Sequence, residues 1–173
     1  MGGQSTNGLL SFTYGLHIIA TVVWAGGLTT LLLFVNPTAR KILTGNVYRP
    51  FVLRMYSRIQ QVGWFCLLVL VGTGLFQMSS NPHYQGFLAV RNSWAFAILL
   101  KHVFIRQLVL VNAYITWILD PKITRTYLAQ RDIENEINYI ELKALETMKV
   151  RLSWVNLLIF LVVLGFTAWA RTA

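Results

Sequence analysis

The chain has 173 residues, of which 55% are hydrophobic and only 12% are charged. A soluble domain carries about twice that charged fraction, so the composition excludes an ordinary soluble domain and indicates an integral membrane protein. The net charge of +9 does not indicate nucleic-acid binding, because the basic residues cluster between apolar runs. The single cysteine, Cys66, excludes an internal disulfide and a multi-cysteine metal site.

Four apolar runs are long enough to cross a bilayer, which takes about 20 helical residues. The predicted spans cover about 9–35, 60–78, 93–119 and 152–170. A proline disfavours helix at the residue before it, so Asn36-Pro37 and Asp120-Pro121 are expected to end the first and third spans. The predicted fold is all-α: an integral membrane four-helix bundle that forms a single domain over residues 1–173.

The positions of lysine and arginine predict the orientation of the spans. Eleven of them lie in or beside the first and third connections: Arg40, Lys41, Arg49, Arg54, Arg58, Lys122, Arg125, Arg131, Lys143, Lys149 and Arg151. Only Arg91 and Arg171 lie at the opposite ends of the spans. We therefore expect both termini outside a cell inner (plasma) membrane, with Arg54 and Arg58 as anchors at the inner end of the second span.

The segment before the fourth span is predicted to be an amphipathic helix. No glycine or proline occurs from Lys122 to Leu164, and apolar residues recur at helical spacing at Ile133, Ile137, Ile140, Ala144 and Met148. We expect a helix over about 126–151 that continues unbroken to near Ala170, as a long cytoplasmic extension of the fourth span. The isoleucines should be covered by the connection after the first span or by a partner chain.

Two histidines lie inside apolar runs, His17 in the first and His102 in the third. An ionisable side chain at membrane depth is costly, which makes each a candidate functional residue. Both lie in the outer half of their spans, at similar depth. Two such imidazoles can ligate a b-type haem iron from both sides, or share a copper ion. Alternatively, each only hydrogen-bonds a neighbouring group.

Two cations accompany the histidine of the third span. Lys101 precedes His102, and Arg106 follows it by four residues, on the same helical face. No acidic residue occurs within any predicted span to pair with them. Backbone carbonyls, water, lipid headgroups or an anionic ligand such as the haem propionates would have to stabilise these charges.

Other residues are candidates for the surroundings of a cofactor. Trp24 lies on the same helical face as His17, and Gly26 and Gly27 would let a neighbouring helix or a flat cofactor approach closely. Met78 and His83, near the outer face, could receive copper.

The first span also carries a family resemblance. Leu16-His17-Ile18-Ile19 followed by Trp24-Ala25-Gly26-Gly27 resembles the first helix of the copper-resistance D (CopD) family, and the HemJ-type membrane protoporphyrinogen oxidase is similar there. Further matching positions are Arg58, Thr73-Gly74 and Lys101-His102. The resemblance covers most of residues 12–110 and implies a bundle with haem or copper associated with histidines on helices one and three. The charged extension after residue 120 is not part of that pattern.

The lead hypothesis is a CopD-like protein that binds haem b and transfers electrons within or beside a membrane redox complex. His17 and His102 would be the axial ligands, Lys101 and Arg106 would offset negative charge, and Trp24 would shape the pocket. The alternatives are a copper-handling membrane protein and a non-catalytic accessory subunit. No hydrolytic motif is present, so any enzymatic role would be redox chemistry with a bound cofactor. The expected partners are the bilayer and other subunits of a redox complex, with no nucleic acid.

Overall fold

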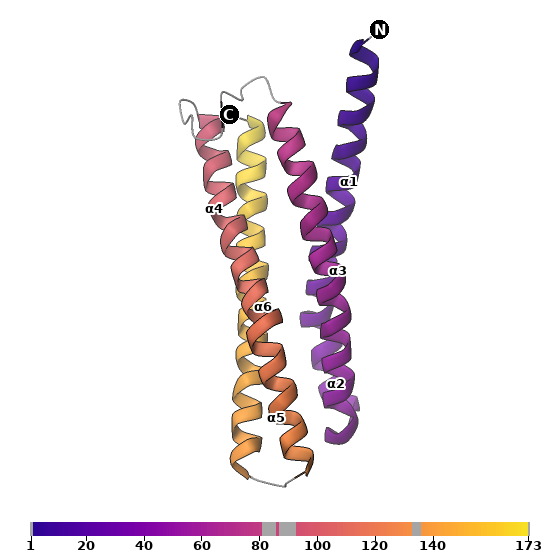
Figure 1. The fold of residues 1–173 in the computed structure, drawn as a ribbon, viewed down its shortest axis with the longest axis vertical. Helices are drawn as coiled ribbons and strands as arrows, with labels where there is room; N and C mark the ends of the chain where they lie inside the picture. The colour runs from indigo at the N-terminus through magenta and orange to yellow at the C-terminus, as the bar shows by residue number, and fades with distance from the viewer. Residues whose placement is uncertain (1, 81–85, 87–92, 133–135, 173) are drawn as a thin grey trace. The chain divides into compact units, whose positions relative to one another are not determined.

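The structure, a computed structural model, describes residues 2–80, 86, 93–132 and 136–172 (Figure 1). Within these residues it is all helical, with no β-strand. Four stretches of helix are long and apolar enough to cross a membrane: Gly8–Ile42, Val47–Ser79, Ser93–Ala129 and Tyr139–Ala170. The prediction of an all-α, multi-pass membrane protein is confirmed at this level.

The chain divides into two compact units, residues 1–91 and 92–173. In the first unit, one continuous helical arm packs against α3 (Gly45–Ser79); the arm consists of α1 (Gly2–Thr30), a π-helical segment η1 (Leu31–Val35) and α2 (Asn36–Ile42). The second unit has the same organisation. Its arm consists of α4 (Ser93–Tyr114), a π-helical segment η2 (Ile115–Leu119) and α5 (Asp120–Asp132), and it packs against α6 (Glu136–Thr172).

The prediction that proline ends the first and third spans is wrong. Each Asx-Pro step is preceded by a five-residue π-helical segment, and the helix then continues through Pro37 or Pro121. The N–H of Asn36 reaches the carbonyl of Leu31, and the N–H of Asp120 reaches that of Ile115, so the hydrogen bonds span five residues. The proline then falls in the first turn of the next α-helical segment, where its missing N–H is tolerated.

The boundaries of the last two helices also differ from the prediction. Residues 126–132 belong to α5, the continuation of the third span, and α6 begins at Glu136 rather than near Thr126. From Glu136 to Thr172 the helix is unbroken, as expected for the part that joins the fourth span. α3 likewise begins at Gly45, well before the predicted start of the second span at residue 60.

The buried face of α6 is not the isoleucine stripe. Ile140 is 63% exposed, whereas Leu142 and Leu145 are buried at 0% and 9%. The side chains of Ile133 and Ile137 lie outside the described residues. Ile140 is not covered within its own unit, and its cover by the first connection or by a partner chain stays a prediction. The face that packs contains Leu142, Leu145 and Lys149, the last at 5% exposure. The isoleucine pattern predicts a neighbouring face instead, because a lysine is not expected on a packed face.

Candidate functional site

His17 of α1 is held by a side chain of α3. Its Nδ1 lies 2.7 Å from the Oγ1 of Thr73, and that hydroxyl donates its only hydrogen to the carbonyl of Val69, also at 2.7 Å. The Thr73 oxygen must therefore accept the bond from the imidazole, so Nδ1 carries the proton. In a neutral imidazole this tautomer places a lone pair on Nε2, the atom that can coordinate a metal ion.

Close packing between α1 and α3 surrounds this histidine. A Cβ added at Gly74 would lie 3.6 Å from His17 Cε1, and one added at Gly63 would lie 3.5 Å from the indole Cδ1 and Nε1 of Trp24. One added at Gly27 would lie 3.5 Å from Ile59. The expected close approach of a neighbouring helix is therefore seen at Gly27. The pyrrole edge of Trp24, buried at 6% exposure, lies against α3.

His102 of α4 has a different partner. Its Nδ1 lies 2.7 Å from the carbonyl oxygen of Ile98, one turn earlier on the same helix. A carbonyl can only accept, so Nδ1 of His102 also carries the proton. The imidazole and the neighbouring Lys101 are half-buried, and Arg106 is exposed.

The structure therefore gives both predicted histidines the same tautomer through different partners. His17 lies in the first unit and His102 in the second, and each is described within its own unit. Of the two residues proposed for copper at the outer face, Met78 is half-buried, and His83 lies outside the described residues. In the part of the chain that the structure describes, no three or more His, Cys, Asp or Glu side chains gather into a group that could hold a metal ion.

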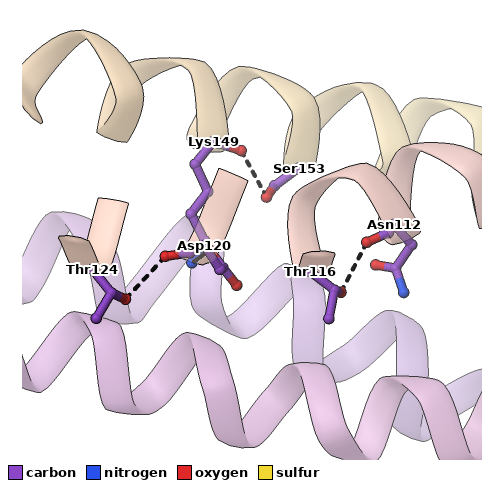
Figure 2. Close-up of polar contacts among 6 residues, drawn as sticks. All are labelled: Asn112, Thr116, Asp120, Thr124, Lys149 and Ser153. Atoms are coloured by element: carbon purple, nitrogen blue, oxygen red, sulfur yellow. Dashed lines mark hydrogen bonds and ion pairs between the residues drawn. The ribbon is translucent and has the colours of Figure 1, made fainter. Parts of the chain in front are cut away.

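The sequence analysis missed a buried ion pair in the second unit. Lys149 of α6 and Asp120, the first residue of α5, point toward each other, with Nζ and Oδ1 2.5 Å apart (Figure 2). The lysine side chain is 6% exposed and the aspartate side chain 24%. From its charge alone, Lys149 is expected in the solvated connection before the fourth span. The available signal was Asp120 itself, the one acidic residue that borders a span.

This ion pair is one end of a polar row between the arm of the second unit and α6. The buried polar side chains beyond it are Asn112 on α4 and Ser153 and Asn156 on α6, at 6%, 3% and 2% exposure. Ser153 donates to the carbonyl of Lys149, and Thr116 donates to that of Asn112 (Figure 2). Among the described residues, Asn156 Oδ1 has no hydrogen-bond partner.

The first unit has a neutral counterpart at the same place in its arm. Asn36, buried at 6% exposure, follows η1 as Asp120 follows η2. Its Oδ1 accepts a 2.8 Å hydrogen bond from the hydroxyl of Tyr48, whose oxygen accepts one of 2.9 Å from Arg40 Nε. In both units a polar side chain next to the proline is therefore bonded to the facing helix.

Comparison with family models, curated proteins and solved structures gives no match for this chain.

Proposed function

We propose that this chain is a CopD-like protein that binds haem b through His17 and His102 and transfers electrons within or beside a redox complex of the plasma membrane. A bound haem would supply one-electron chemistry of the iron. Lys101 and Arg106 would offset the negative charge of the propionates, and Trp24 would limit the pocket on the side of α1.

The observation that carries the proposal is the shared tautomer of the two histidines. Ligating histidines almost always donate their other ring N–H to a carbonyl, a carboxylate or water, which fixes the ring and raises the basicity of the ligating nitrogen. His102 donates Nδ1–H to the Ile98 carbonyl, and His17 donates to a Thr73 hydroxyl that is itself bonded to a carbonyl. In its neutral form each ring therefore presents the lone pair of Nε2, the atom through which it would coordinate the iron.

The positions of the histidines along their arms support a shared depth in the membrane. His17 lies 19 residues before Asn36, and His102 lies 18 residues before Asp120. Each of these end points directly follows a five-residue π-helical segment. Measured along each arm from its Asx-Pro step, the two positions differ by one residue, which corresponds to about 1.5 Å of helix. The lysine and arginine distribution predicts that this inner level is cytoplasmic and that both termini are outside.

Haem is favoured over copper by the number of protein ligands. A porphyrin supplies four nitrogens to the iron, so two histidines complete its coordination. A bare copper ion would draw more of its ligands from the protein, and would need Met78 or His83 in addition to the two histidines.

The decisive experiment is a reduced-minus-oxidised absorption spectrum of the purified full-length protein, together with metal analysis. We expect a b-type haem spectrum, lost in His17→Ala and in His102→Ala. His83→Ala, which removes the remaining histidine of the chain, is the matched control and should keep it. A colourless wild-type protein with bound copper would instead favour copper handling. A protein with neither cofactor would favour an accessory subunit.

A further inference from the structure

One face of α3 carries two arginines between exposed apolar side chains. Phe51, Arg54, Arg58, Val62 and Phe65 follow one another at intervals of three or four residues, so they share one side of the helix. All five are exposed, the apolar ones at 40%, 49% and 68% in chain order. We call this set the arginine face.

The packing of α1 on α3 indicates how deep the arginine face lies. Ile59, next to Arg58, faces Gly27 of α1, where an added Cβ would lie 3.5 Å from its side chain. Gly27 is five residues inward of residue 22, the middle of the apolar run 9–35, which corresponds to about 8 Å. The hydrocarbon core extends about 15 Å on each side of its middle. Arg58 therefore begins within the inner hydrocarbon layer, and Arg54 lies one turn closer to the inner surface.

No carboxylate of the first unit can neutralise these two cations. Residues 1–91 contain no aspartate and no glutamate; all six acidic residues lie between positions 120 and 146. A guanidinium at this depth is costly unless its flexible stem carries it toward the interface and an anion binds it there. The planar guanidinium matches the oxygens of a phosphate in a bidentate geometry.

We propose that Arg54 and Arg58 bind the phosphate of an anionic phospholipid of the inner leaflet, whose acyl chains lie along Val62 and Phe65. Val62 and Phe65 lie on the membrane-centre side of the arginines, where the acyl chains of a lipid would contact them. A free phosphate would make no such contact. Two adjacent cations in a unit without carboxylates select an anionic lipid over a zwitterionic one. The proposal does not depend on the histidines or on a haem.

The test measures lipid retention on the purified full-length protein by native mass spectrometry. The probes are phosphatidylglycerol and phosphatidylcholine with identical acyl chains, supplied in equal amounts. We expect phosphatidylglycerol to be retained in excess. Arg58→Gln should lower the ratio of the two lipids about fivefold, and Arg54→Gln/Arg58→Gln should bring it close to one. Arg58→Lys, which keeps the charge, should retain a preference and serves as the variant least prone to folding defects.

The matched control is Arg125→Gln, which removes an exposed arginine from α5 of the other unit. It should leave the lipid ratio unchanged. An equal loss in this control would mean that net charge alone attracts the lipid, and the proposal would be wrong. Displacement of the lipid by millimolar inorganic phosphate would assign the arginines to a free anion instead. If the double variant kept the wild-type ratio of phosphatidylglycerol to phosphatidylcholine, the lipid site would be overturned. The carboxylates of a partner protein would then be the expected counter-charge.

Discussion

The two units both continue a helix through an Asx-Pro step, but one stabilises the step with neutral side chains and the other with a charged pair. In each unit, a π-helical segment precedes an Asx-Pro step, the helix of the arm continues through the proline, and the side chain at the step bonds to the facing helix. The first unit uses a neutral amide and a phenol, Asn36 and Tyr48. The second uses the charged pair Asp120 and Lys149.

The difference shows where each unit obtains its counter-charges. The second unit contains all six acidic residues and forms ion pairs between α5 and α6. The first unit has six basic residues, Arg40, Lys41, Arg49, Arg54, Arg58 and Arg91, and no carboxylate. No side chain of the first unit can therefore balance these positive charges, whereas those of the second unit are balanced in part from within. Substitutions at matching places should accordingly have unequal effects.

The largest effect is expected from Asp120→Asn. The change removes the charge opposite a lysine whose side chain is only 6% exposed. Breaking a buried pair in this way costs about 3 kcal/mol, at the low end of the usual range because Asp120 is partly exposed. Reversible unfolding in mixed micelles, followed by circular dichroism, measures the change in the free energy of unfolding.

A double variant separates the ion pair from other effects of this change. Asp120→Asn/Lys149→Gln removes both charges and should recover most of the loss, since neither charge then remains buried alone. If the double variant is as unstable as the sum of the two single variants, the pair is not coupled and the comparison between the units fails.

The sequence predicted the helices better than it predicted their ends and their packed faces. Hydropathy located the four apolar runs, because membrane insertion depends on summed apolar character. Pro37 and Pro121 were read as helix ends by a local rule, but a five-residue hydrogen-bond spacing before each proline lets the helix continue, and no local pattern encodes it. The sequence predicted Ile140 on the packed face and Lys149 in solvent, and the structure has the reverse. A lysine is expected in solvent unless its partner is known.

The candidate site was predictable in its residue types and less so in its contacts. His17 and His102 stood out because ionisable groups are rare in apolar runs. The hydroxyl of Thr73 that orients His17 is 56 residues away in the sequence, and only the packing of α1 on α3 brings it there. The Asp120–Lys149 pair was missed for the same reason, since its partners come from different helices.

A second comparison concerns the partners of the two histidines. The Nδ1 of His17 hydrogen-bonds to a side chain. The Nδ1 of His102 hydrogen-bonds to a backbone carbonyl of its own helix, which no side-chain substitution removes. On the proposed function, Thr73→Val should lower haem affinity 10- to 100-fold, the usual cost of losing a residue that orients a ligand. Titration of the apoprotein with haem measures this affinity.

Thr73→Ser is the matched control, because it keeps the hydroxyl and should bind haem nearly as the wild type does. The result that would contradict the role of Thr73 is an equal loss in both variants, which would point to packing of the threonine methyl group instead.

At the Asx-Pro step of the first unit, Tyr48→Phe should have a smaller effect than Asp120→Asn. It removes the hydroxyl that donates to Asn36 and accepts from Arg40 while keeping the ring. The bond to Asn36 joins two neutral groups and the bond from the charged Arg40 is exposed to solvent, so their loss costs about 1 kcal/mol. The same unfolding assay provides the comparison, and a loss as large as that of Asp120→Asn would mean that the neutral contact is not the weaker one.

The smallest effect is expected at the exposed ion pair of the second unit. Lys122 and Glu141 approach to 3.1 Å, but their side chains are 56% and 46% exposed, so water and salt screen the attraction. Lys122→Gln should therefore change the free energy of unfolding by at most a few tenths of a kcal/mol at physiological salt. Measurements at low and high salt sharpen the contrast: any loss at Lys122 should vanish at high salt, whereas the loss in Asp120→Asn should largely persist because that pair is buried. A large, salt-independent loss in Lys122→Gln would show that this pair, too, is shielded from solvent in the membrane-bound protein.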